Sequence, residues 1–244
     1  MVFDKASGWL LPIPRVEDEC RRPACWEIVE TTLFTAILWF VPVMLSLSVH
    51  EWAHAASAYK LGDDTAARMG RMTLNPISHI DPVGTLLLPA LQVISTGSVL
   101  FAWAKPVPVN PANFSRRVTM SQGNVIVSAA GPASNLVLAL IAAIALGVSF
   151  RFGWGSEAVL HFLGSMFILN IGLAVFNLLP VPPLDGSKVL HGLLPRGAAA
   201  AYERIFPYAP FLLLGVLLLG RDLIRWPVQL IYGWMAAVTQ VIAG

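Results

Sequence analysis

Charge is scarce in this sequence. Only 12% of the 244 residues are Asp, Glu, Lys or Arg, whereas soluble domains carry about 25%. Hydrophobic residues make up 56%, and the mean hydropathy is +0.68. The composition excludes an ordinary soluble domain and predicts a polytopic membrane protein. The net charge is only +2 and the basic residues are scattered, so we expect no nucleic-acid partner.

Cysteine is also scarce, with only Cys20 and Cys25. The pair could form a local disulfide, complete a small metal site or remain as two free thiols, and we assign it no function. Residues 1–27 hold charges and prolines instead of an early apolar stretch, so we expect no cleavable signal peptide. The sequence has no visible internal repeat, heptad run or low-complexity tract.

A His-Glu-x-x-His motif follows a long uncharged stretch. Residues 31–49 carry no charge and are long enough to cross a hydrocarbon core about 30 Å thick. His50 and His54, four residues apart, share one face of a helix and can bind one metal ion, while Glu51 lies beside them as a general base. Alternatively, the three groups only reach interfacial water at the helix end. The spacing favours peptide hydrolysis.

Further apolar stretches define the predicted fold. Residues 124–150 and 159–179 read as clean spans, and residues 205–220 and 228–243 as two short spans or one span plus an interfacial helix. Residues 71–75 and 105–110 read as short strands. We therefore predict an all-α polytopic membrane protein with five to six transmembrane or re-entrant helices and short β-strand segments near the active site. The expected parts are a polar segment 1–30, a catalytic core 31–195, and one or two helices within 196–244.

Asp185 is the best candidate for a third metal ligand. A catalytic zinc site generally takes three protein ligands and leaves one position for water. Asp185 follows three prolines that must break the preceding helix, and an aspartate among apolar groups needs a cation. Alternatively, Asp185 is an interfacial residue that caps the next helix.

These motifs resemble the site-2 proteases, a family of intramembrane zinc metallopeptidases (peptidase family M50). The resemblance rests on His50-Glu51-x-x-His54 and on Asn177-x-x-Pro180-x-Pro182-x-x-Asp185-Gly186. It extends over residues 31–195 through three further stretches that look like the small prokaryotic branch without a PDZ domain: 70–76 with 79–82, 104–111 and 130–135.

The resemblance implies roles for several residues. His50, His54 and Asp185 would bind Zn²⁺, Glu51 would act as the base, and Asn177 would hold the substrate or the oxyanion. Asn135 would do the same or form a hydrogen bond between helices. His79, in a loop, is expected in a turn or beside the ligands and not on the metal.

A shared metal ion also constrains the topology. If the two motifs lie at one membrane depth, their spans run parallel, and residues 83–104, which contain one proline and two glycines, form a re-entrant element. Charge counting instead favours a full crossing there. The first topology places the active site near the cytoplasmic face of a prokaryotic cell membrane, with the N-terminus outside.

The sequence therefore predicts a protease that cleaves membrane proteins within or near their transmembrane segments. Its expected partners are a membrane-protein substrate and the lipid bilayer, and the sequence does not give the oligomeric state. The alternative function is a non-catalytic metal-binding scaffold or an ion transporter.

Overall fold

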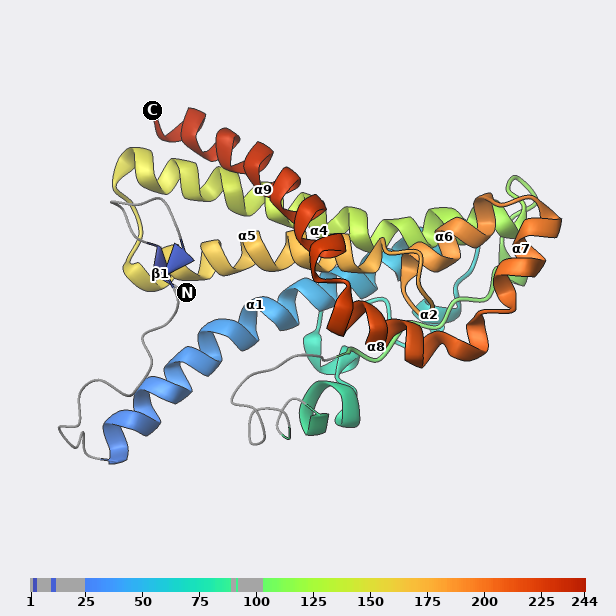
Figure 1. Cartoon of the computed structure of the whole chain (residues 1–244), viewed down its shortest axis with the longest axis horizontal. Helices are drawn as coiled ribbons and strands as arrows, with labels where there is room; N and C mark the ends of the chain where they lie inside the picture. The colour runs from blue at the N-terminus through green and yellow to red at the C-terminus, as the bar shows by residue number, and fades with distance from the viewer. Residues whose placement is uncertain (1, 4–9, 12–24, 89–90, 92–102) are drawn as a thin grey trace. The chain divides into compact units, whose positions relative to one another are not determined.

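The computed structural model describes residues 2–3, 10–11, 25–88, 91 and 103–244 (Figure 1). The chain divides into two compact units, residues 1–37 and 38–244. In the first unit, β1 (Val2–Phe3) pairs antiparallel with β2 (Leu10–Leu11), and the helix α1 (Cys25–Lys60) begins. Cys20 lies outside the described residues.

In the second unit, every element of the described residues is a helix. After α1 ends at Lys60, its elements are α2 (Thr65–Arg68), the 3-10 helix η1 (Pro76–His79), the π-helix η2 (Pro82–Leu87), the 3-10 helix η3 (Pro111–Asn113), α4 (Met120–Phe152), α5 (Glu157–Asn177), α6 (Asp185–Leu193), α7 (Arg196–Glu203), the 3-10 helix η4 (Phe206–Tyr208), α8 (Ala209–Leu219) and α9 (Arg221–Ala243).

Local sequence signals set the ends of the helix α4. Thr119 and Gln122 form a reciprocal capping box at the start of α4, so two of the N–H groups that a helix start leaves unpaired are satisfied. Gly153, with a φ of 64°, ends the same helix in the left-handed conformation that glycine adopts without a Cβ clash. α4 therefore runs uninterrupted for 33 residues, although it contains Pro132.

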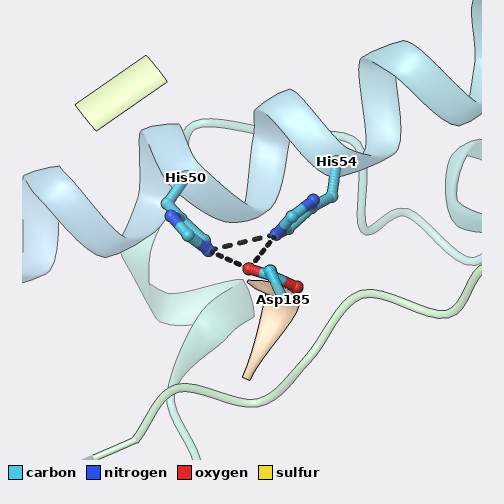
Figure 2. Close-up of side chains that lie close together, drawn as sticks. All are labelled: His50, His54 and Asp185. Carbon is cyan, nitrogen blue, oxygen red and sulfur yellow. Dashed lines mark hydrogen bonds and ion pairs between the residues drawn. The ribbon is translucent and has the colours of Figure 1, made fainter. Parts of the chain in front are cut away.

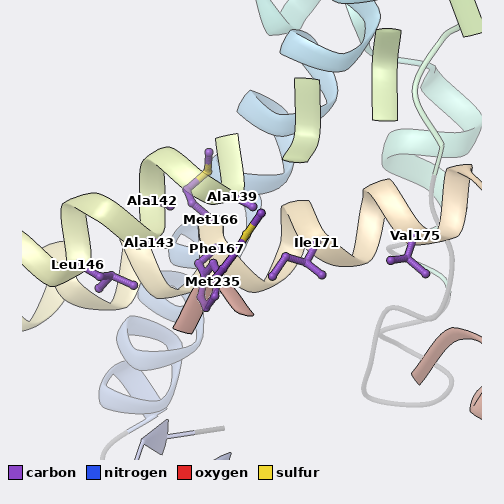
Figure 3. Close-up of a cluster of buried hydrophobic side chains, with 9 residues drawn as sticks. All are labelled: Ala139, Ala142, Ala143, Leu146, Met166, Phe167, Ile171, Val175 and Met235. Atoms are coloured by element: carbon purple, nitrogen blue, oxygen red, sulfur yellow. The ribbon is translucent and has the colours of Figure 1, made fainter. Parts of the chain in front are cut away.

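α4 and α5 lie side by side and form the apolar core together with α9 (Figures 1 and 3). α4 contributes small residues to this core, and α5 contributes larger ones that fill the space between the helices. The buried cluster consists of Ala139, Ala142, Ala143, Leu146, Met166, Phe167, Ile171, Val175 and Met235. α4 also contacts α6, so one helix connects the core to the element that begins with Asp185.

Three helical segments in the described part of the chain are long and apolar enough to cross a membrane. They are Met120–Phe152, Glu157–Asn177 and Arg196–Leu219. The first two confirm that residues 124–150 and 159–179 form apolar helices of spanning length. The total of five to six spans stays a prediction, and most of the predicted re-entrant element 83–104 lies outside the described residues.

The predicted strands near the active site are wrong. Residues 71–75 and 105–110 are all described, and none belongs to a strand. Backbone N–H groups of both segments donate to acceptors that do not belong to a neighbouring strand. Arg71 N donates to the carbonyl of Ala66, and in the second segment Val107 N and Asn110 N donate to carboxylate side chains.

Candidate metal centre

The end of α1 and the start of α6 bring three ligand atoms together (Figure 2). Nε2 of His50 and Nε2 of His54 lie 3.0 Å apart. Oδ2 of Asp185 lies 3.2 Å from the first and 3.1 Å from the second. All three side chains are buried. The structure therefore brings the three predicted ligands into one cluster that could hold a metal ion.

The turn between α5 and α6 positions Asp185. α5 ends at Asn177, and α6 begins at Asp185 after the proline-containing turn. A Cβ on Gly186 would lie 2.2 Å from the carbonyl oxygen of Leu178, so only glycine lets α6 start this close to the end of α5. Nζ of Lys188 lies 3.3 Å from Oδ1 of Asp185, the carboxylate oxygen that does not face the histidines. Asp185 thus presents one oxygen to the cluster and the other to a cation.

The second nitrogen of each imidazole is already hydrogen-bonded. Nδ1 of His54 donates to the carbonyl oxygen of Val127 at 2.7 Å, and Nδ1 of His50 lies 2.6 Å from Oδ1 of Asn135. A carbonyl oxygen only accepts, so Nδ1 of His54 carries a proton, which leaves Nε2 as the nitrogen that can bind a metal ion. With Nε2 of both rings as acceptors, these three atoms about 3 Å apart would repel one another unless a cation lay between them.

The spacing of these atoms fits zinc. Tetrahedral zinc bound at about 2.0–2.2 Å separates its ligand atoms by about 3.3 Å, close to the 3.0–3.2 Å found here. Two imidazole nitrogens and one carboxylate oxygen are a common donor set for catalytic zinc, which leaves a fourth position for water. The residues present therefore fit this metal.

Gly131 of α4 packs directly against the two imidazoles. A Cβ at this position would lie 2.4 Å from Nε2 of His54 and 2.6 Å from Nε2 of His50. Real Cβ atoms do not approach heavy atoms so closely, so any larger residue must displace the rings or the helix. Glycine at residue 131 is a requirement of the cluster's geometry.

Glu51 is buried next to the cluster and binds a backbone N–H. Its Oε2 accepts from Val107 N at 2.8 Å. The segment 103–107 is held in place by Lys105, whose N–H donates to the carbonyl of His79 and whose carbonyl accepts from Nη2 of Arg71. The loop 71–79 thus supports the segment that contacts the predicted base.

Asp63 anchors the chain that follows this segment. Its buried carboxylate accepts from the backbone N–H of Asn110 at 2.7 Å, from Nδ2 of Asn113 at 2.9 Å and from Thr65. Burial alone would raise the pKa of Asp63, but these hydrogen bonds stabilise the carboxylate and the pKa is lowered. Residues 110–113 are therefore tied to the end of α1 by an ionised side chain.

A cavity of about 820 Å³ opens at the cluster. Its walls are mostly apolar, with Val127 on α4, Phe176 on α5 and Leu213 on α8 among them. Asn177 also lines the cavity, and its Nδ2 donates to the carbonyl of Leu173, so one amide hydrogen is used within α5. The cavity suits an apolar ligand that places a polar group against the cluster.

The other two candidates from the sequence, Asn135 and His79, do not line the cavity. Asn135 is fully buried and contacts His50, so it lies beside the cluster and not in the cavity lining. His79 is outside the cluster, and its Nε2 donates to the carbonyl of Thr73, as expected for a histidine in a turn.

Sequence reasoning missed several residues that contact the site. Lys188 could have been found three residues after Asp185 on the same helix face. Asn170 is an amide within an apolar span, which is itself a signal of a buried polar contact, and it binds Asn135. The contact of Val107 with Glu51 has no local signal, because it joins residues 56 apart in the chain.

Comparisons with known proteins agree with these observations. The model of peptidase family M50 matches residues 152–217, which include α5 and Asp185. YwhC of Bacillus subtilis, a predicted zinc metalloprotease, is 40% identical over 194 residues, covering 77% of this chain and 83% of that protein. No solved structure gives a significant match.

Two proteins called Rip2, also predicted zinc metalloproteases, are further relatives. The one from Mycolicibacterium smegmatis is 34% identical over 191 residues, 78% of this chain and 69% of that protein. The one from Mycobacterium tuberculosis strain H37Rv is 32% identical over 196 residues, 79% and 70% respectively. The chain therefore belongs to peptidase family M50, the site-2 proteases, and is a zinc metalloprotease of the membrane.

Proposed function

We propose that this protein hydrolyses peptide bonds within or near the transmembrane segments of other membrane proteins, in regulated intramembrane proteolysis. The observation that carries the proposal is the convergence of three buried ligand atoms, from His50, His54 and Asp185, in the wall of a mostly apolar cavity. In this proposal these three residues hold Zn²⁺. The apolar cavity favours a substrate that arrives from the hydrocarbon phase.

His50, His54 and Asp185 would hold the zinc ion, whose chemistry would be to polarise the scissile carbonyl and to make water a stronger acid. Glu51, with Oε2 held by Val107 N–H, accepts the proton of the attacking water and returns it to the leaving amine. The amide of Asn177 keeps one free hydrogen after its bond to Leu173, and this hydrogen donates to the developing oxyanion.

A helical substrate must unwind locally before hydrolysis, because a helix engages its own peptide groups in internal hydrogen bonds. The segment 103–107, which is neither helix nor strand, lies beside the cluster and lines the cavity with Trp103 and Val107. A substrate segment that unwinds here would lie along these residues. The proposal places this site near the cytoplasmic face of the cell membrane.

The test compares wild type with Glu51→Gln. Both are purified, their zinc content is measured, and cleavage of a panel of transmembrane peptides is followed in liposomes. We expect about one zinc per chain in both and a fall in kcat of about 100- to 10,000-fold in the variant, because general-base catalysis contributes that much. Glu157→Gln, the same change on an exposed residue of α5, is the matched control.

Each outcome of this test has a distinct meaning. Retained cleavage in Glu51→Gln removes Glu51 as the base. Zinc binding without cleavage of any peptide by wild type favours a metal-binding scaffold or transporter. A wild-type protein without zinc contradicts the ligand assignment itself.

A further inference from the structure

A chain of buried amide side chains runs from His50 into the core between α1, α4 and α5. Asn135 Nδ2 donates to Asn170 Oδ1 at 2.7 Å, beyond the contact of Asn135 with His50. Nδ2 of Asn170 donates to Oγ of Ser46 and to the backbone carbonyl of Met166, each at 2.8 Å. Asn135, Asn170 and Ser46 are fully buried. We name Asn135, Asn170 and Ser46 the amide relay.

The two histidines of the metal centre differ in how their proton is placed. The partner of His54 is a backbone carbonyl, which can only accept and so always selects the form with the proton on Nδ1. The partner of His50 is a side-chain amide, which could offer either its oxygen or its NH₂ group. If Asn135 turned its NH₂ group to His50, the ring would carry its proton on Nε2 and could not bind metal through that nitrogen. Something must therefore orient Asn135.

The carbonyl of Met166 provides that orientation. It only accepts, so the atom of Asn170 that lies 2.8 Å from it must be the NH₂ group. The oxygen of Asn170 then faces Asn135, which must answer with its own NH₂ group. The oxygen of Asn135 is left for His50, whose Nδ1 must donate. Each link follows from the one before it, because these fully buried groups are paired with one another.

We propose that Asn170, which touches neither the cavity nor the metal ligands, is a positioning residue that fixes the His50 tautomer through Asn135 and so keeps Nε2 free to bind zinc. The inference rests on the proposed function, in which His50 is a zinc ligand. It adds that the backbone carbonyl of Met166 on α5 sets the donor-to-acceptor direction of the hydrogen bonds along the relay. Ser46 does not set this direction, because its hydroxyl can accept or donate.

The first experiment leaves every residue of the relay unchanged. The full-length protein is labelled with ¹³C and ¹⁵N on histidine, stripped of zinc and reconstituted in liposomes, and the His50 ring signals are identified by their loss in His50→Ala. We expect Nδ1 of His50 in wild type to carry a proton, because it donates to Asn135. A wild-type ring with no proton on Nδ1 overturns the proposal. Because no zinc is present, this result does not depend on activity.

The second experiment breaks the relay at two points. Asn170→Leu keeps a similar volume but leaves Asn135 without its orienting partner, so we expect a mixture of His50 tautomers and a zinc Kd about 10- to 100-fold higher by chelator competition. Ser46→Ala leaves the bond between Asn170 and the Met166 carbonyl intact, and we expect the wild-type tautomer and Kd. Ser165→Ala, which removes a buried hydroxyl of α5 that contacts His161 instead, is the control.

The results separate this inference from the proposed function. An unchanged tautomer and Kd in Asn170→Leu overturns the inference, and so does an equal loss in Ser46→Ala, which would indicate a general packing effect. A wild-type protein that binds no zinc contradicts the proposed function, while the tautomer measurement still decides whether Asn170 orients His50.

Discussion

Replacing Gly131 by alanine tests the metal centre without changing any ligand. The added Cβ would lie 2.4 Å from Nε2 of His54 and 2.6 Å from Nε2 and Cε1 of His50, roughly 1 Å inside ordinary van der Waals contact. The rings, the helix α4 or both must move. Overpacking of this kind costs about 1–3 kcal/mol. If all of that strain falls on the zinc-bound state, the zinc Kd rises by about 5- to 140-fold, since each 1.4 kcal/mol is a factor of ten.

The assay is chelator competition on purified protein, with thermal unfolding measured in parallel. Gly172→Ala is the matched control, because a Cβ at that position of α5 meets no heavy atom within 4 Å. We expect the control to keep the wild-type Kd. A Gly131→Ala protein that binds zinc within twofold of wild type would refute the packing argument. A protein that loses zinc affinity only because it unfolds is recognised by its melting curve.

Two other predictions concern the segments beside the cluster. Val107→Pro removes the N–H that donates to Glu51, so we expect about tenfold slower peptide cleavage at unchanged zinc content. The physical reason is that leaving a buried carboxylate oxygen without its donor costs about 1–3 kcal/mol. Val107→Ala keeps the N–H and so measures the effect of the side chain alone; equal rates in the two variants would contradict the role of the bond. Asp63→Asn should lower the melting temperature at pH 7. Because the folded-state pKa of Asp63 is lowered below 3.8, the carboxylate stabilises the fold above that value and loses this effect as the pH falls through the folded-state pKa. The melting-temperature difference between wild type and Asp63→Asn should therefore shrink below about pH 4, and a constant difference would count against the assignment.

The sequence predicted which three side chains would lie together because each motif has a local signal. His50 and His54 are four apart on one helix, and Asp185 follows a proline-rich helix end. The resemblance to the site-2 proteases is what joined the two motifs. The apolar helices around residues 124–150 and 159–179 were also predicted from a local signal. Long uncharged stretches leave few alternatives.

The features that were missed depend on partners far away in the chain. Alternating valine and proline at residues 105–110 suggested an edge strand, but the pattern does not say which acceptor an N–H will meet, and Val107 meets Glu51. The contact of Asn170 with Asn135 joins two helices and is invisible to any local period. The need for glycine at residue 131 follows only once α4 is packed on the imidazoles.

The ligands of the cluster come from residues that lie far apart in the sequence. His54 and Asp185 are 131 residues apart, and the two imidazoles also depend on α4 for Val127 and Asn135. During synthesis, α1 emerges long before α6, so the nascent chain offers only two of the three ligand groups until the turn after α5 has been made. Zinc affinity should thus rise steeply only after the last of these helices has been inserted. A newly made chain would then remain without peptidase activity until its own fold is complete.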